Sequence, residues 1–319
     1  MPEGRNLRIL VTGVAGFVGS HIAQALVKDG HQVVGVDSLI PIPYAVEQKL
    51  ETLASLRGVI EFYEIDLRVA ALEPYVKGID VVVHSAGMAG LLPSWEHIDV
   101  YLSCNVTATA RLARAAIDFG VGRFIHLSSS SVYGGAYSAI ETYIGQPLSP
   151  YGVTKKAAED ILRVYERTFG LPLTILRLFT VYGPGQRADM AFNRFIDAVL
   201  LNQPVMITQP LNSLRSATYI DDCVTGIKLA TYQDCVGSTF NLAGASAVSL
   251  REVLHAIAEA TGRQPILALG AERAGDQPAS IADISRARSE IGFRPAVSLV
   301  EGIQRQVSWQ RHRMTNSVA

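Results

Sequence analysis

The sequence predicts an α/β protein built on a Rossmann-type doubly wound parallel sheet, followed by a smaller C-terminal α/β lobe. Two observations support this fold class. In the first 180 of the 319 residues, short runs rich in Val, Ile and Leu alternate with helix-length segments, which is typical of buried parallel strands connected by helices. The first of these runs also leads directly into a glycine-rich turn, as strands of nucleotide-binding sheets do.

The expected elements follow one another along the chain. Strands are expected at 7–12, 32–37, 59–65, 80–86, 123–129 and 173–179, and the amphipathic helices between them include 99–119 and 152–169. After residue 180 the pattern changes to helices at 190–202, 221–232, 250–261 and 299–311, with brief strands near 205–208, 217–220 and 239–243. Two of the later helices begin with the Ser-x-x-Glu capping-box pattern, at 249–252 and 298–301.

This change of pattern divides the chain into two parts. Residues 1–180 form the expected nucleotide-binding domain, and residues 181–319 form the main part of the substrate-binding lobe. No flexible linker separates them, so the chain is free to cross between the two parts.

Composition excludes several classes of protein. Charged residues make up 18% of the chain and the formal net charge is −1, which leaves no electrostatic footprint for a nucleic acid or an anionic membrane. No apolar stretch approaches the roughly 18 residues of a membrane-spanning helix. The cysteines are far apart and the histidines show no ligand spacing, which predicts no disulfide framework and no metal site. We therefore expect a cytoplasmic protein, with Cys104 in its core.

The glycine-rich turn has the pattern G-x-x-G-x-x-G. Gly13 follows the first strand, and Gly16, Phe17, Val18 and Gly19 run into the first helix. Glycines here allow a tight turn and a close approach to a pyrophosphate, to which the helix N-terminus presents free N–H groups. Glycines also occur in turns for purely steric reasons, but the place between strand and helix favours a dinucleotide.

Two acidic residues follow the next strands. Asp37 ends the second strand, 18 residues after Gly19, where a carboxylate accepts hydrogen bonds from the adenosine ribose hydroxyls and repels a 2′-phosphate. This predicts NAD rather than NADP. Asp66 and Leu67 follow the third strand, where Asp66 is within reach of the adenine amino group. The alternative for Asp37 is a solvated loop position.

A second constellation points to hydride transfer. Tyr151 and Lys155 are four residues apart at the start of a helix, so they share one face. A free tyrosine has a pKa of about 10, and an ammonium group together with a positive nicotinamide ring would favour its phenolate. Ser128 to Ser131 follow the fifth strand, at the sheet edge where such folds bind ligands.

In these motifs the chain resembles the extended short-chain dehydrogenase/reductases that modify nucleotide sugars. TGVAGFVG, HSAG (84–87), SSSSVYG, SPYGVTK (149–155) and RLFTVYGPGQR (177–187) occur in the order typical of that family. The resemblance implies that Tyr151 is the base, that Lys155 activates it and binds the nicotinamide ribose, and that Ser129 binds the substrate oxygen. It also implies an NAD contact formed by the backbone of Ser85, Ala86 and Gly87.

The residues before VYG narrow the reaction. Members of the family that dehydrate or decarboxylate their substrates carry Glu, often with Asp, where this chain has Ser130 and Ser131. A hydroxyl does not serve as the acid or base of water elimination at neutral pH. The expected reaction is therefore 4-epimerisation through a transient 4-keto sugar with NAD bound throughout.

The downstream segments narrow the choice of sugar substrate. Residues 180–191 and 215–222 resemble segments of UDP-glucuronate 4-epimerases, which implies UDP-glucuronate as substrate and UDP-galacturonate as product. Candidate ligands are Arg187, Arg194 and Arg215 for the diphosphate, and Ser130, Ser131 and Thr180 for the carboxylate. Leu92 stands where these epimerases often have arginine.

Other readings of the sequence stay open. They are a UDP-galactose or other nucleotide-hexose 4-epimerase, a uronate decarboxylase or dehydratase, and an NAD-binding regulator without turnover.

The resemblance also implies a homodimer, paired through the helices at 99–119 and 152–169.

Overall fold

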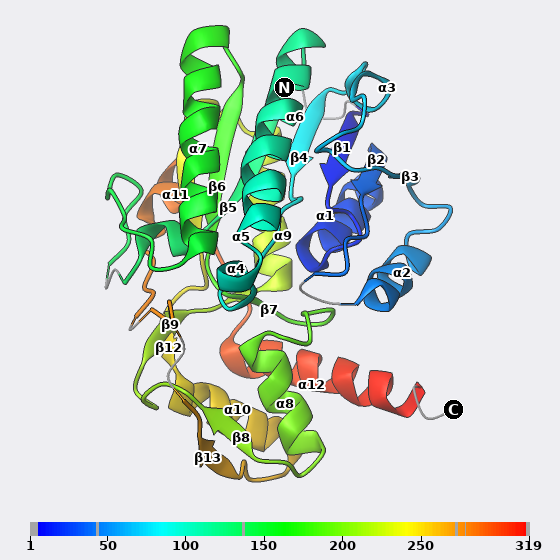
Figure 1. Ribbon diagram of the computed structural model, residues 1–319. Helices are drawn as coiled ribbons and strands as arrows, with labels where there is room; N and C mark the ends of the chain where they lie inside the picture. Colours follow the sequence, from blue (N-terminus) through cyan, green and yellow to red (C-terminus); the bar gives the residue numbers. More distant parts are fainter. Residues whose placement is uncertain (1–5, 43–44, 136–137, 272–273, 278, 317–319) are drawn as a thin grey trace.

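The computed structural model describes residues 6–42, 45–135, 138–271, 274–277 and 279–316 (Figure 1). Within these residues, seven strands form one parallel sheet in the order β11-β6-β5-β4-β1-β2-β3. The strands are β1 (Arg8–Thr12), β2 (Gln32–Asp37), β3 (Glu61–Glu64), β4 (Val81–His84), β5 (Arg123–Ser129), β6 (Leu173–Leu178) and β11 (Thr239–Leu242). The predicted α/β class and parallel sheet are confirmed.

The strand order reverses between β1 and β4, since β1 pairs with β2 on one side and with β4 on the other. Ligands of doubly wound sheets bind at such a switch point, outside the carboxyl ends of the strands. The seventh strand comes from late in the chain: β11 pairs with β6. The chain therefore leaves the sheet after β6 and returns to it, as the absence of a linker allowed.

Alternate residues of each strand serve two separate cores. Ile9 and Val11 of β1 belong to the core that also contains residues of α1 (Phe17–Lys28) and α9 (Ile220–Tyr232). Leu10 belongs to the opposite core, which is covered by α6 (Ala108–Asp118) and α7 (Pro150–Phe169). Because successive strand side chains point to opposite faces, this arrangement explains why the strands are apolar throughout.

The expected helix at 99–119 is interrupted. It consists of α5 (Ile98–Tyr101), a π-helical turn at Leu102–Thr107, and α6. Asn105 in the π turn donates from Nδ2 to the Met88 carbonyl at 3.0 Å and to the Thr154 hydroxyl at 3.0 Å. The prediction that Cys104 lies in the core is wrong, since the π turn leaves it partly exposed at the edge of a cavity.

The smaller lobe lies below the sheet in Figure 1. Its helices are α8 (Ala191–Leu200), α10 (Leu250–Thr261) and α12 (Leu299–Asn316), and its short strand pairs are β8 (Val205–Ile207) with β13 (Leu267–Leu269) and β9 (Leu214–Ser216) with β12 (Ala247–Ser249). Both bonds of the predicted capping box form between Ser249 and Glu252. At α12, Ser298 accepts from the Glu301 N–H, while the Glu301 carboxylate pairs with Arg305.

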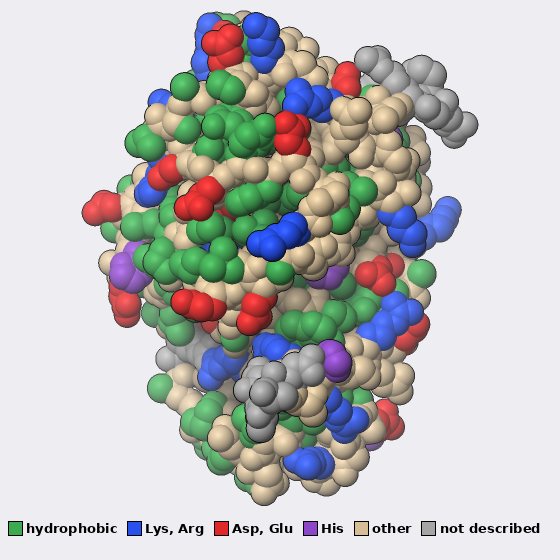
Figure 2. Space-filling view, turned by 90° about the vertical axis from the view of Figure 1, so that its right-hand side faces the viewer, with side chains coloured by type: hydrophobic (Ala, Val, Ile, Leu, Met, Phe, Trp, Pro, Cys, Tyr) green, Lys and Arg blue, Asp and Glu red, His purple; other side chains and the backbone are tan. Residues whose placement is uncertain are grey.

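The remaining elements lie between these strands and helices along the chain. They are α2 (Val46–Ala54), α3 (Glu73–Val76), α4 (Pro93–Glu96), a 3₁₀ turn (Ser130–Tyr133), α11 (Ser285–Glu290) and the strand pair β7 (Val181–Tyr182) with β10 (Thr218–Tyr219). No helix among the described residues is long and apolar enough to cross a bilayer. On the face drawn in Figure 2, basic and acidic side chains are interspersed.

Candidate active site

A cavity of about 730 Å³ opens at the carboxyl ends of the strands and is lined by residues from both parts of the chain. Most of the predicted site residues meet there: Gly13, Gly16, Phe17, Val18, Asp37, Asp66, Leu67, Ser85, Ala86, Gly87, Ser129, Ser130, Ser131, Tyr151, Lys155, Thr180, Arg187 and Arg194. The structure does not bring Gly19 or Arg215 into this lining.

The glycine turn owes its shape to close backbone contacts. Gly13 has a φ of 69°, and a Cβ there would lie 2.8 Å from backbone atoms of Ala86. A Cβ on Gly19 would lie 2.2 Å from the Gly13 carbonyl oxygen, so Gly19 is required for packing α1 against the turn rather than for lining the cavity. The first turn of α1 has no side-chain cap and no acidic residue. Its N–H groups are therefore suited to an anion.

Asp37 lines the cavity from the end of β2, which β1 and β4 separate from β5 in the sheet. Its carboxylate accepts from the backbone N–H of Ala15 at 3.2 Å and of Leu39 at 2.9 Å. The ammonium of Lys49, on α2, lies 3.6 Å from Asp37 Oδ1, and both side chains are buried. Sequence reasoning missed Lys49, because a single lysine on α2 belongs to no motif that would connect it with Asp37.

Asp66 lines the cavity with its carboxylate held by a neighbour. Arg68 donates to it from Nε at 3.0 Å and from Nη2 at 2.7 Å. Arg68 lowers the pKa of Asp66 through these hydrogen bonds. The predicted contact of Asp66 with an adenine amino group stays a prediction, and Arg68 competes for the same carboxylate oxygens.

These features fit a dinucleotide. The cavity volume lies in the range of cofactor sites, the glycine turn leaves room that a Cβ would fill, and the uncapped helix end suits a pyrophosphate. The Asp37 carboxylate at one end suits ribose hydroxyls.

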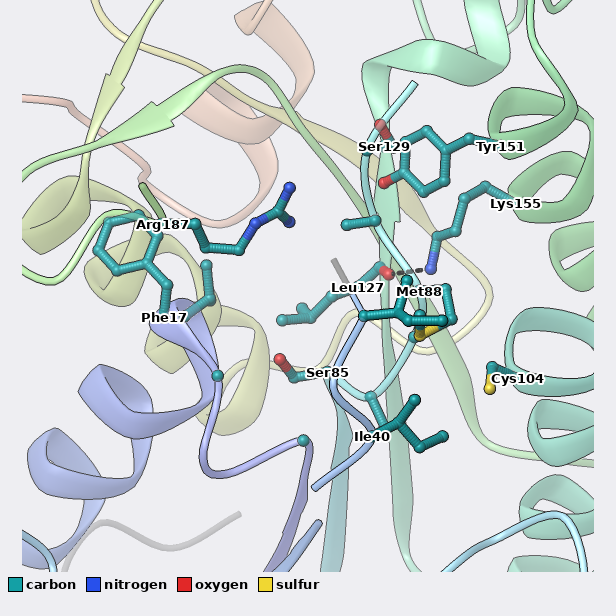
Figure 3. A pocket seen from close by; sticks show the side chains of 18 of the residues that line it. Phe17, Ile40, Ser85, Met88, Cys104, Leu127, Ser129, Tyr151, Lys155 and Arg187 are labelled. Atoms are coloured by element: carbon teal, nitrogen blue, oxygen red, sulfur yellow. Dashed lines mark hydrogen bonds between the residues drawn. The ribbon is translucent and has the colours of Figure 1, made fainter. Parts of the chain in front are cut away.

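At the opposite end, hydroxyl groups from β5 and α7 face each other. Ser129 ends β5, and its Oγ accepts from the Ser131 N–H at 3.1 Å. Figure 3 shows the Tyr151 ring beside Ser129. Burial raises the pKa of the Tyr151 phenol, while a side-chain hydrogen bond with Ser129 and the positive charge of Arg187 act in the opposite direction.

Lys155 lies one helical turn after Tyr151 and on the same side of the cavity (Figure 3). Its ammonium donates to the Leu127 carbonyl at 2.7 Å. Burial lowers the pKa of Lys155 to about 8, and the carboxylate of Glu159 opposes that shift. Because the ammonium is directed at Leu127, its support of a Tyr151 phenolate stays a prediction.

The three candidate arginines have different surroundings. Arg187 reaches across the cavity toward Ser129 and Tyr151 (Figure 3) and pairs with Asp189 at 2.7 Å. Arg194, on α8, also lines the cavity. Arg215 instead donates to the Gln209 side chain at 2.6 Å and to the Gln277 carbonyl. Its predicted contact with a diphosphate is therefore not visible in this arrangement.

Comparisons with known proteins agree with this geometry. The model of the NAD dependent epimerase/dehydratase family matches residues 9–243. An uncharacterised UDP-glucose epimerase, YtcB of Bacillus subtilis, is 38% identical over 310 residues, covering 95% of this chain and 98% of the relative. The structure of Bacillus cereus UDP-glucuronic acid 4-epimerase with UDP-glucuronic acid and NAD is similar with a TM-score of 0.93 at 35% identity, covering 96% and 100%. MoeE5 with UDP-glucuronic acid and NAD reaches 0.87 at 40% identity, covering 96% and 99%.

The Asp37 carboxylate generates a prediction about the cofactor. We expect Asp37→Ala to weaken NAD binding about 10- to 100-fold, because hydrogen bonds to a charged group are lost. NADP should be discriminated against less, because the variant leaves the Lys49 ammonium where the ribose is expected. Isothermal titration calorimetry with both dinucleotides measures the two effects.

Glu64→Ala is the matched control for this test. It removes an exposed carboxylate from the β3 residue that pairs with Asp37, and NAD affinity should not change. Equal affinities of the unaltered protein for NAD and NADP would contradict the assignment of Asp37.

Proposed function

The chain belongs to the NAD dependent epimerase/dehydratase family, and we propose that it interconverts UDP-glucuronate and UDP-galacturonate. It is an NAD-dependent nucleotide-sugar 4-epimerase. One observation carries the choice of sugar: three hydroxyl side chains and one guanidinium line the cavity near Ser129. Ser130 and Ser131 directly follow Ser129, Thr180 comes two residues after Leu178, the sheet partner of Ser129, and Arg187 extends toward Ser129 in Figure 3.

The first half of the reaction oxidises carbon 4 of the sugar. Tyr151 takes the proton of the 4-hydroxyl, and Ser129 donates a hydrogen bond to the same oxygen. NAD, held by the glycine turn and Asp37, would supply the hydride acceptor for carbon 4 and the donor for the return step. Lys155 supplies a buried positive charge one helical turn from Tyr151, which favours the phenolate needed for proton removal.

The second half inverts the configuration. The 4-keto sugar turns over within the cavity so that the hydride returns to its opposite face. Tyr151 then gives its proton to the carbonyl oxygen and regenerates its phenolate. The second half returns the hydride and the proton that the first half removed, but to the opposite face of carbon 4. The net change is therefore inversion at carbon 4, with no net oxidation or reduction.

A uronate substrate can lose its carboxylate as carbon dioxide during the reaction. The 4-keto form of UDP-glucuronate is a β-keto acid. Such an acid loses carbon dioxide readily when its carboxylate is perpendicular to the ring and a nearby acid can protonate the resulting enolate. Hydroxyls donate hydrogen bonds to a carboxylate but are too weakly acidic to protonate an enolate readily. Ser130, Ser131 and Thr180 would therefore hold the carboxylate without promoting its loss.

Arg187 can supply the positive charge that is missing at Leu92, where UDP-glucuronate 4-epimerases often have arginine. Leu92 lines the cavity and is 45% exposed, so the cation expected at that position is missing. Arg187 extends toward Ser129 and Tyr151 from the other side of the cavity (Figure 3), and a guanidinium is well suited to binding a carboxylate. We therefore assign Arg187 to the sugar carboxylate in place of the diphosphate.

A neutral sugar is the second candidate. Leu92 gives the cavity an apolar wall segment, and YtcB, at 38% identity, carries the name of a UDP-glucose epimerase. UDP-galactose or another nucleotide hexose would then replace the uronate. Arg187 and the three hydroxyls argue against this choice, because a hydroxymethyl group offers them no charge to bind.

The three unpaired cysteines among the described residues fit a reducing compartment. On this ground we place the enzyme in the cytoplasm.

The substrate prediction is tested with a panel of UDP-sugars. We expect UDP-glucuronate and UDP-galacturonate to interconvert, with little UDP-pentose formed, as read by NMR of the products. Thr180→Ala should lower epimerisation and raise release of carbon dioxide, because it loosens the carboxylate. Much faster turnover of UDP-galactose than of UDP-galacturonate would establish the neutral-sugar function instead.

A second prediction concerns the base. Tyr151→Phe keeps the ring and removes the ionisable oxygen, so kcat should fall by about 10²–10⁴-fold, as when a general base is removed. Binding of the UDP-sugar should survive. Tyr165→Phe, on the same helix but outside the cavity lining, is the control and should leave kcat unchanged. A near-normal rate for Tyr151→Phe would exclude the mechanism.

A third prediction concerns assembly. We propose that α7 and the π turn before α6 pair with a second copy, because Leu102, Val153, Val164 and Phe169 there are 44–52% exposed. Val164→Asp should shift the protein from dimer to monomer in light scattering at micromolar concentration. Val59→Asp, which alters an exposed residue outside these helices, should not. A monomeric unaltered protein would contradict the proposal.

A further inference from the structure

A buried ionic network lies directly behind the Tyr151 end of the cavity. Its centre is Glu159 of α7, which is 3% exposed. Arg177 of β6 donates to the Glu159 carboxylate from Nε at 3.0 Å and from Nη2 at 2.7 Å, and the Ser128 hydroxyl of β5 donates to it as well. The carboxylate thus joins one helix to two neighbouring strands.

The network is continued on the far side of Arg177. The guanidinium donates from Nη1 to the Tyr133 hydroxyl at 2.8 Å, and that hydroxyl donates to Asn241 at 2.7 Å. Arg177 is therefore held in place by groups from the 3₁₀ turn and from β11. This leaves Glu159 with a fixed, bidentate partner rather than a mobile one.

Glu159 and Lys155 bind consecutive residues of the same strand. Lys155 donates to the carbonyl of Leu127, and the next residue, Ser128, donates to Glu159. Ser129, the proposed ligand of the sugar oxygen, follows immediately. Since Lys155 and Glu159 are four residues apart on α7, they lie one above the other on the helix face that meets β5.

The charges around Lys155 come from three elements. Glu159 and Tyr151 lie on its own helix, while His84 of β4 and His126 of β5 lie behind it. Burial lowers the pKa of His84 to about 3 and that of His126 well below its usual range, with the Lys155 charge contributing to both shifts. Both imidazoles are therefore neutral. The Glu159 carboxylate, which also carries the ion pair with Arg177, acts to raise the pKa of Lys155.

We propose that Glu159 is a positioning residue for the reaction: it fastens α7 to β5 beside Ser129 and keeps the Lys155 side chain cationic in a buried site. This assignment rests on the proposed roles of Tyr151 and Lys155. It differs from a purely structural role because it ties the protonation of Lys155 to the charge of Glu159. Arg177 and Ser128 fix the carboxylate in the place where it has this effect.

The test measures the protonation of Lys155 directly. The chain contains six lysines, and the NMR signals of its isotopically labelled side chains are followed against pH without substrate. The Lys155 signal is the one missing from Lys155→Met. In the unaltered protein it should titrate near pH 8. In Glu159→Gln, which keeps the size but removes the charge, it should titrate about one unit lower, as expected for loss of an adjacent opposite charge.

The pH profile of kcat gives the second measurement. Activity that needs a cationic Lys155 is lost as the pH rises through the pKa of that residue. In Glu159→Gln this loss should begin at lower pH by the same amount as the shift of the NMR titration. A fall in kcat by one factor at every pH would instead show a structural role and overturn the proposal.

Asp160→Asn is the matched control. It removes a carboxylate from the next residue of α7, whose side chain is 63% exposed and paired with Lys156. The titration of Lys155 and the pH profile should stay unchanged. An effect as large as that of Glu159→Gln would show that any charge on the helix suffices, which would also overturn the proposal.

Glu159→Asp covers the case in which Glu159→Gln does not fold. It keeps the charge and the partner Arg177, but it withdraws the carboxylate by one methylene. The pKa of Lys155 should then fall by less than in Glu159→Gln, and kcat at neutral pH should be mostly restored. A pKa of Lys155 lowered by a full unit in this charge-conserving variant would contradict the proposal. Because the titration needs no turnover, it stands apart from the identity of the sugar.

Discussion

The site depends on how closely the first turn of α7 approaches the end of β5. A Cβ on Gly152 would lie 2.6 Å from the Ser131 carbonyl oxygen, so only glycine allows this approach. Ser149 caps the helix by accepting from the Gly152 N–H at 3.1 Å, and Pro150 occupies its first turn. These contacts fix where the helix begins. Tyr151 is then brought to the end of β5 beside Ser129, and Lys155 reaches the Leu127 carbonyl one turn later.

This junction also explains the electrostatic character of the cavity. The strand end contributes hydroxyls and carbonyls, while the helix contributes a phenol and an ammonium whose pKa values are both shifted by burial. The Arg187 charge comes from the other wall. A site of this composition is suited to proton transfer and anion binding. Among the described residues, the hydroxyls of Ser130 and Ser131 follow Ser129, where water elimination would require a carboxylic acid.

Much of this arrangement could be predicted from the sequence, because its signals are local. Strand positions follow from apolar runs. The glycine turn, Asp37 and the pair Tyr151 and Lys155 are recognised from local spacing, and the family resemblance selects Ser129 from a run of four serines. What could not be predicted depends on contacts between distant segments. The π turn exists because Asn105 bonds to Met88 and Thr154. The return of β11 to the main sheet has no local signal that separates it from the other short strands of the second half.

The arginines show the same limit more sharply. A motif identifies Arg187 and Arg215 as anion ligands, but only the fold shows which way each one points. Arg215 is held by Gln209 and Gln277, and Arg187 is directed at the catalytic end of the cavity (Figure 3). Likewise, Glu159 on α7 pairs with Arg177 on β6. Spacing along the sequence does not predict that these two side chains meet.

The origin of the proposed carboxylate ligands connects sugar recognition with the placement of the two parts of the chain. Ser130 and Ser131 follow β5 of the main sheet, whereas Thr180 and Arg187 flank β7, where the chain turns toward the smaller lobe. In the proposed function, a uronate held by both sets bridges the two parts. Arg187, which pairs with Asp189, then contributes a guanidinium that is suited to a carboxylate and gains no such contact with the hydroxymethyl group of a hexose. The proposed selectivity for a uronate is therefore a property of the assembled cavity, in which Arg187 takes the role of the arginine expected at Leu92 and a different element of the chain supplies the positive charge.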